Sequence, residues 1–160
     1  MRRVFLLIYR IVRNVDDAQD LTQEAFIKAL QRQDQLKDLE KAAHWLSRIA
    51  TNTAIDFLRR SGRVNFSDID DAPAPALKSR VESPEQRVLR SEHRAHLEAA
   101  LDVLTPRERL ALLLRDVEDL PAEEVAERLS CSKATVRSHI ANARVKLRKF
   151  WERGSKRGQL

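Results

Sequence analysis

Apolar residues recur every three or four positions through most of this chain, a spacing typical of amphipathic α-helices. In the first third of the sequence this spacing predicts helices over residues 4–13, 17–30 and 41–60. Residues 33–40 are polar and turn-like, so they separate the second helix from the third. Gly62 suits the position just past the end of the third helix, because glycine adopts a left-handed backbone without strain.

Within these segments the apolar positions indicate which side of each helix faces a core. Asp16, Asp17 and Asp20 suit the N-terminal end of the second helix, where the helix dipole is positive. Its expected apolar stripe consists of Leu21, Ala25, Phe26, Ile27 and Leu30. The third helix is expected to bury, at least in part, Trp45, Leu46, Ile49, Thr53, Ile55 and Leu58.

Residues 62–83 lack a helical period. They contain prolines and three closely spaced aspartates, and such a composition is typical of an acidic, flexible linker. The sequence therefore predicts an all-α fold with two small helical domains, residues 1–61 and 84–153. A basic tail is expected at residues 154–160.

The second domain is expected to open with two capped helices. Ser83-Pro84-Glu85 combines an N-cap residue, a proline at the first helical position and an early acid, and this helix is expected to run to about Leu104. Thr105-Pro106-x-Glu108 has the form of a capping box, and it begins a helix that is expected to run to about Val117.

Residues 121–148 carry the most specific pattern in the chain. A short helix begins at Pro121, a three-residue turn follows at Ser130-Cys131-Ser132, and Ser132 suits the N-cap of the next helix. The inner stripe of the two helices is expected to consist of Val125, Ala126, Leu129, Val136, Ile140, Ala143 and Leu147. This arrangement is typical of a helix-turn-helix whose second helix enters the major groove of DNA, and an ordinary helical hairpin is the alternative.

The outer side of the helix that follows Ser132, the second helix of the helix-turn-helix, carries the candidate DNA contacts. Arginine and lysine suit guanine edges and phosphates, asparagine suits adenine, and hydroxyl groups suit either. The candidates are Ser132, Lys133, Thr135, Arg137, Ser138, His139, Asn142 and Arg144. Glu123, Glu124 and Glu127 on the preceding helix argue against close approach of phosphates there, so a protein partner is the alternative for that side.

Charge sharpens this interpretation. The 160 residues include 30 Lys plus Arg and 24 Asp plus Glu, for a net charge of +6. Residues 133–157 alone hold nine bases and one acid, whereas residues 91–132 hold five bases and ten acids. The positive surplus therefore belongs to one helix and its tail, which favours nucleic acid as the partner. From charge alone, a solvated amphipathic helix is an equal alternative.

Several other classes of protein are disfavoured. No run approaches the roughly 20 apolar residues of a membrane span, and the first residues lack the cleavage site of a secretory signal, so a cytoplasmic location without membrane insertion is expected. The single cysteine, Cys131, rules out a disulfide scaffold and fits a reducing compartment. Without a Gly-rich phosphate loop or a nucleophile beside a base, neither an enzyme nor a cofactor site is expected. His93 and His96 alone make a weak metal site.

Two families share the C-terminal pattern. Residues 104–149 resemble both the extracytoplasmic-function (ECF) sigma factors of bacterial RNA polymerase and the DNA-binding domain of LuxR-type regulators. The N-terminal half separates them, because DAQDLTQEAFIKAL (Asp17–Leu30) and WLSRIATNTAIDFLRR (Trp45–Arg60) resemble sigma domain two. The chain is thus identified as a member of the ECF group, with a LuxR-type transcriptional regulator as the alternative.

The resemblance implies a function and a set of contacts. Residues 1–61 would form sigma domain two, a three-helix bundle, and residues 84–153 would form sigma domain four, which reads the minus-thirty-five element with its helix-turn-helix. The implied partners are promoter DNA, core RNA polymerase through its β′ clamp coiled coil and β flap, and an anti-sigma factor under stress or envelope-signal control. An adaptor that mainly binds protein is a further alternative.

The resemblance also assigns residues of the first domain. Contacts to core polymerase are implied for Asp20, Gln23, Glu24 and Lys28, with a solvated helix face as the alternative. Contacts to the opened minus-ten element are implied for Trp45, Asn52, Asp56, Arg59 and Arg60, although a tryptophan such as Trp45 is more often a core residue than a platform for base stacking. The loop of residues 35–41 matches the family loop that holds a base extruded from the stack.

Overall fold

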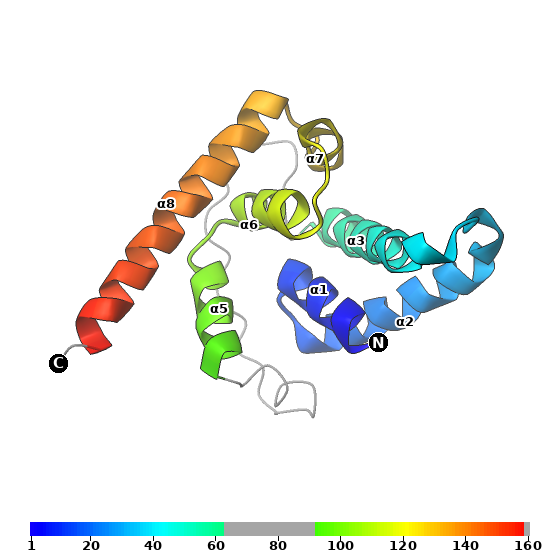
Figure 1. Cartoon of the computed structure of the whole chain (residues 1–160), viewed down its shortest axis with the longest axis horizontal. Coiled ribbons are helices and arrows are strands. Elements are labelled where there is room, and N and C mark those ends of the chain that lie inside the picture. The colour runs from blue at the N-terminus through cyan, green and yellow to red at the C-terminus, as the bar shows by residue number, and fades with distance from the viewer. Residues whose placement is uncertain (63–91, 159–160) are drawn as a thin grey trace. The chain divides into compact units, whose positions relative to one another are not determined.

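The computed structural model describes residues 1–62 and 92–158, with side chains described from residue 95 to residue 156 in the second range. All regular structure in these residues is helical, so the all-α prediction is confirmed for them. They divide into two compact units: the N-terminal unit ends at Gly62, and the C-terminal unit begins at Glu92 (Figure 1). The expected linker beyond Gly62 and the expected cap at residues 83–85 lie outside the described residues.

Three helices that contact one another pairwise make up the N-terminal unit: α1 (Arg2–Val12), α2 (Val15–Gln31) and α3 (Ala42–Ser61). Between α2 and α3 the chain makes two short 3₁₀ turns, η1 (Gln33–Gln35) and η2 (Leu39–Lys41), in the segment that the sequence predicts as turn-like. α1 is buried on most sides, since every residue from Val4 to Ile8 lies in the core. Its apolar composition therefore reflects its position between the other two helices.

The caps of these helices follow local chemistry. The side chain of Asn14 accepts a hydrogen bond of 2.9 Å from the backbone N–H of Asp17, so α2 begins two residues before the predicted start. Gly62 adopts a left-handed backbone with φ of 67° at the end of α3, and its N–H donates to the carbonyl of Arg59, as the sequence predicts.

The predicted apolar stripe of α2 is wrong in its second half. Ile27 is 55% exposed and Leu30 is 69% exposed. The buried stripe instead consists of Val15, Ala18, Leu21, Thr22 and Ala25. Apart from the adjacent Leu21 and Thr22, these residues follow one another at three-residue steps on one side of the helix, and two of them are alanines that allow close approach of a neighbouring helix. Ile27 and Leu30 lie off this stripe, so packing against α1 and α3 leaves them on the surface.

The C-terminal unit consists of α5 (Glu92–Asp102), α6 (Pro106–Leu112), the π-helical turn η3 (Leu113–Val117), α7 (Ala122–Leu129) and α8 (Lys133–Gly158). The long helix α8 packs on α5, α6 and α7, so these short helices rest on one scaffold (Figure 1). The predicted helix up to Val117 is present, but its last turn widens from α to π geometry.

The capping box at the start of α6 is confirmed. Thr105 Oγ1 accepts a hydrogen bond of 3.2 Å from the backbone N–H of Glu108, and a carboxylate oxygen of Glu108 accepts one of 2.9 Å from the backbone N–H of Thr105. Among the described helices, none combines the length with the apolar character that crossing a bilayer requires.

Candidate nucleic-acid interface

The turn between α7 and α8 has the form that the sequence predicts. Ser130 adopts a left-handed backbone with φ of 54° and ends α7, and the backbone N–H of Cys131 donates to the carbonyl of Ala126. Ser132 then caps α8, because its Oγ accepts a hydrogen bond of 3.1 Å from the backbone N–H of Thr135. The backbone path from one helix to the other is therefore fixed by hydrogen bonds on both sides of the turn.

The inner sides of α7 and α8 are apolar and closed to solvent. All seven residues of the predicted inner stripe are buried, and the two helices contact each other and α6. Burial of this kind sets the rotation of α8 about its own axis, because turning the helix would expose the stripe to water. The opposite side of its first turns is consequently directed to solvent.

The structure exposes most of the candidate DNA contacts on α8. Ser132, Lys133, Arg137, Ser138, Asn142 and Arg144 are exposed. Thr135 and His139 are half-buried; the Thr135 hydroxyl lies 2.9 Å from Ser132 Oγ, and His139 Nε2 is closed to solvent. These two side chains therefore contribute less to the exposed surface than the sequence pattern indicates.

Three bases of α8 form ion pairs with acids of the preceding helices. Lys133 Nζ lies 2.8 Å from Glu123 Oε1 of α7, and Arg144 Nη2 lies 3.2 Å from Asp116 Oδ2 of η3. Lys146 Nζ lies 2.7 Å from Glu108 Oε1 of α6. Sequence reasoning separated an acidic segment from a basic one but did not pair their members.

The pairs change the acidity of two glutamates. A hydrogen bond from Lys133 lowers the pKa of Glu123, with smaller contributions from its own backbone and from the charges of Lys133 and Arg137. Burial alone would raise the pKa of Glu108, but hydrogen bonds from Lys146 and Thr105 outweigh burial, and the pKa lies below its ordinary value. Both carboxylates are thus held in the charged form.

A hollow of about 570 Å³ lies between η3 and α8. Arg115, Arg137 and Arg144 line it together with Asp116 and Asp119. Arg115 is engaged within the unit, since its guanidinium donates to the carbonyl of Leu120 and lies 3.7 Å from Asp119. Two acids and three bases line this hollow, so it does not present a purely positive surface.

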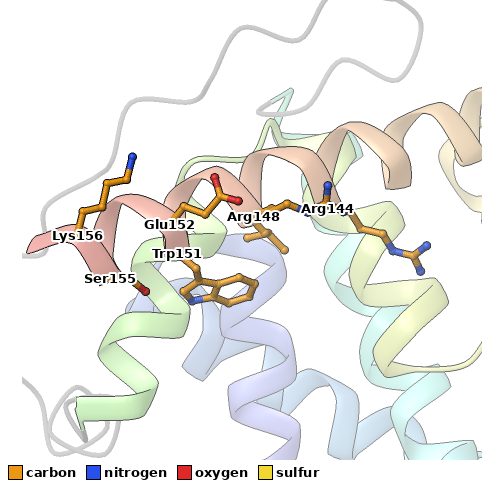
Figure 2. Close-up of a pocket in the computed structure, with 7 residues that line it drawn as sticks. Arg144, Arg148, Trp151, Glu152, Ser155 and Lys156 are labelled. Carbon is orange, nitrogen blue, oxygen red and sulfur yellow. The ribbon is translucent and has the colours of Figure 1, made fainter. Parts of the chain in front are cut away.

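The sequence pattern singles out the bases in the distal part of α8 but not its tryptophan. Trp151 is 42% exposed, and a hollow of about 780 Å³ runs beside it along the helix. In Figure 2, Glu152 and Lys156 project from one side of α8, whereas the indole of Trp151 extends from another. The signal available in the sequence was a tryptophan that falls outside the inner stripe, within a strongly basic helix.

The candidate minus-ten residues share one exposed side of α3. Asn52, Asp56, Arg59 and Arg60 are all exposed, and they follow one another at helical spacing. The backbone carbonyl of Asp56 accepts a hydrogen bond of 3.4 Å from Arg60 Nε. Trp45 is half-buried, which fits partial membership of the core and leaves one part of its ring accessible.

The candidate core-polymerase residues on α2 fall into two groups. Asp20 and Gln23 are exposed, whereas Glu24 and Lys28 pair with each other at 2.8 Å. Lys28 also reaches α3, where its Nζ lies 3.4 Å from Thr53 Oγ1, so it helps to join the two helices.

Ile27 and Leu30 add exposed apolar surface beside these polar residues on α2. The apolar period of the sequence does not reveal that these two residues are exposed, because the same spacing is compatible with a buried stripe.

Two alternative chemistries find no support in the part of the chain that the structure describes. Those residues contain no group of three or more metal-ligating side chains, and the ring of His96 packs against Phe150 with centroids 5.3 Å apart; the side chain of His93 lies outside the described residues. Cys131 is half-buried, and burial raises the pKa of its thiol against a smaller, opposite effect of Arg107. This thiol is packed rather than activated.

Comparisons with known proteins recover both halves of the chain. Residues 1–64 match the family Sigma-70 region 2, and residues 94–147 match Sigma-70, region 4. The chain is 40% identical over 152 residues to the ECF RNA polymerase sigma factor SigE of Mycolicibacterium smegmatis, covering 92% of this chain and 57% of that protein. It is 38% identical over 149 residues to the RNA polymerase sigma-H factor of Pseudomonas aeruginosa, covering 89% of this chain and 77% of that protein.

A third relative and a solved structure agree with these matches. The ECF RNA polymerase sigma-E factor of Escherichia coli is 35% identical over 148 residues, covering 89% of this chain and 77% of that protein. The sigma factor RpoE of Bartonella quintana, solved in complex with the anti-sigma factor NepR, has a TM-score of 0.57 at 21% identity, covering 94% of this chain and 90% of that one. At this identity the likeness concerns the fold.

The N-terminal match decides between the two families that share the C-terminal pattern. LuxR-type regulators account for the helix-turn-helix alone, whereas the sigma-70 regions match in order on both sides of residues 65–93. This chain therefore belongs to the ECF sigma factors of RNA polymerase, a family of non-enzymatic initiation factors that direct the polymerase to promoters.

Proposed function

We propose that this chain reads a minus-thirty-five promoter element with the N-terminal turns of α8. The observation that carries the proposal is the capped start of α8, whose buried inner stripe directs Lys133, Arg137 and Asn142 to solvent. A recognition helix contacts base edges with its N-terminal turns, and arginine and asparagine are the side chains that best distinguish guanine and adenine there. Arg148 and Lys149, further along the exposed helix, suit phosphates.

The N-terminal unit supplies the second promoter contact in this proposal. The exposed row Asn52, Asp56, Arg59 and Arg60 on α3 offers amide and guanidinium donors to single-stranded DNA. The half-exposed ring of Trp45 offers a surface on which a base can stack. Contacts at both elements allow one chain to select a promoter by two short sequences.

We further propose that α2 docks on core RNA polymerase. Asp20 and Gln23 provide exposed polar groups, and Ile27 and Leu30 provide apolar area beside them. Exposed apolar residues gathered on one helix are typical of a protein-binding surface. The β′ clamp coiled coil is the partner that the family implies for α2, and the β flap is the one that it implies for the C-terminal unit.

An anti-sigma factor is a further proposed partner. The Bartonella quintana sigma factor was solved in complex with one, and that protein shares the fold of this chain. A protein that binds core polymerase and promoter DNA acts where the polymerase is, so we propose the cytoplasm as its location.

In vitro transcription tests the central proposal. Core polymerase with this chain is expected to start transcripts at discrete sites on a library of genomic fragments from the source organism, whereas core polymerase alone is not. The variant Arg137→Ala is expected to shift or abolish these starts, whereas Arg153→Ala, on the distal part of α8, is expected to leave their positions unchanged. An unchanged set of starts with Arg137→Ala would contradict the proposed reading of the minus-thirty-five element.

A further inference from the structure

Two of the side chains proposed to contact DNA are held by carboxylates of the same unit. Lys133, in the first turn of α8, pairs with Glu123 of α7 at 2.8 Å. Arg144, three turns along the helix, donates to Asp116 of η3 at 3.2 Å. The two pairs are independent, since the acids come from different elements and the bases from different turns.

Both pairs lie at the surface, where exchange with another anion is easy. The side chains of Lys133 and Glu123 are 50% and 64% exposed, and those of Arg144 and Asp116 are 61% and 38% exposed, so water screens both pairs. A DNA phosphate carries the same charge as a carboxylate and takes the same lysine or guanidinium donors. A phosphate can therefore replace the carboxylate of Glu123 or Asp116 without any change of fold.

We infer that Glu123 and Asp116 compete with DNA phosphates for Lys133 and Arg144, and so limit the affinity of the C-terminal unit for DNA. This inference rests on the proposed function of α8. A bond to its carboxylate occupies N–H donors of each base that a phosphate would otherwise take, and the carboxylate lies close to the DNA and repels it. This free-energy cost applies at any DNA sequence, so it weakens non-specific binding.

The inferred competition accounts for the position of an acidic segment directly before the basic one. Residues 91–132 hold ten acids and five bases, directly before a segment of nine bases and one acid. A basic helix without neighbouring acids would bind any duplex, because phosphate contacts supply most non-specific affinity. With two bases already paired, base-edge contacts from residues such as Arg137 and Asn142 carry a larger share of the binding free energy.

The test compares Glu123→Gln with Glu127→Gln in the full chain. Glu127 is exposed on the same helix one turn later, and Lys133 pairs with Glu123 instead, so the Glu127 variant removes the same charge without freeing Lys133. Affinity for a mixed-sequence duplex of about 30 base pairs is measured by fluorescence anisotropy at low salt, where phosphate contacts are strongest. The comparison of Glu123→Gln with Glu127→Gln is repeated in a Lys133→Gln background, and circular dichroism checks that each variant is folded.

Glu123→Gln is expected to tighten duplex binding about two- to fivefold, and by more than Glu127→Gln does. In the Lys133→Gln background the two variants are expected to bind alike, because no lysine remains to be released. Asp116→Asn is expected to act in the same direction through Arg144, whereas Asp119→Asn is not, because Arg115 still donates to the carbonyl of Leu120 when this carboxylate is lost.

Three results would overturn the inference. One is equal binding by Glu123→Gln and Glu127→Gln in the wild-type background. Another is weaker binding by Glu123→Gln, since Glu123 would then orient Lys133 toward DNA rather than withhold it. The third is no measurable binding by any variant. The Arg137→Ala variant distinguishes failure of this inference from failure of the proposed function. If Arg137→Ala weakens duplex binding while Glu123→Gln has no effect, the proposed DNA contact stands and only the inferred competition is wrong.

Discussion

Lys146 Nζ lies 2.7 Å from Glu108 Oε1, and the same carboxylate closes the capping box at the start of α6 by accepting from the backbone N–H of Thr105. One side chain thereby joins α6 to α8 across 38 residues of sequence. The Glu108 side chain is only 5% exposed, so its hydrogen bonds are protected from water. This contact joins α8, which carries the recognition residues, to α6.

Replacement of Glu108 by alanine is expected to destabilise the C-terminal unit by about 1–3 kcal/mol, because the capping box and the bond to Lys146 are lost together. Urea unfolding followed by the fluorescence of Trp151 in a Trp45→Phe background reports on this unit. Glu127→Ala, at an exposed position of α7, is the control and is expected to change the free energy of unfolding much less. Equal destabilisation by the two variants would contradict the role of Glu108.

Acid is expected to weaken the same contact. The pKa of Glu108 is lowered in the folded chain from its ordinary value of 4.5, so its charged form stabilises the fold above that value. This contribution is lost as the pH falls below 4.5 and through the lower pKa of the folded state. The difference in unfolding free energy between the wild type and Glu108→Gln is therefore expected to shrink on acidification. A difference that stays constant from neutral pH to about pH 3 would contradict this linkage.

The buried alanine on α8 is expected to tolerate no larger side chain. Ala143 lies in the inner stripe with no exposed surface, so Ala143→Leu must displace neighbouring helices and is expected to cost about 1–3 kcal/mol. Ala141→Leu makes the same change on the exposed side of the helix and serves as the matched control. Thermal unfolding of the two variants checks the prediction. A lower melting temperature for Ala141→Leu than for Ala143→Leu would contradict the packing.

A charge at Ile27 is expected to impair docking on core polymerase without unfolding the N-terminal unit. Ile27→Asp places a carboxylate on a side chain that is already 55% exposed, so its cost to stability is expected to be small. Its cost to binding is expected to be large, about tenfold or more, if the residue is buried against polymerase. Val103→Asp, at an exposed position of the C-terminal unit, is the control. Co-elution with core polymerase and titration of affinity measure the effect.

The thiol of Cys131 is expected to react slowly. Burial raises its pKa above the ordinary value of 9.0, so the reactive thiolate is scarce at neutral pH. Alkylation by iodoacetamide is expected to be several-fold slower in the folded chain than in urea, and to accelerate with rising pH. Rates that match in the folded and unfolded chains would show that the turn does not shield the sulfur.

Much of the candidate site was accessible from sequence because its determinants are local. Ser132 caps α8, Thr105 and Glu108 form a capping box, and Gly62 ends α3, as their spacing predicts. The inner stripe of α7 and α8 also follows from a single period of the helix. Such features depend on a few neighbouring residues, so the order of side chains along the chain contains them.

The contacts between elements were not accessible in this way. The apolar period of α2 does not reveal that its buried stripe excludes Ile27 and Leu30, because the neighbouring helices select the stripe. The sequence by itself determined most of the helices, most of their caps and the basic character of α8. Only the tertiary structure decided that Glu108, Asp116 and Glu123 pair with bases of α8. The physical reason is that helix formation and capping act over a few residues, whereas ion pairs and burial depend on distances that packing alone creates.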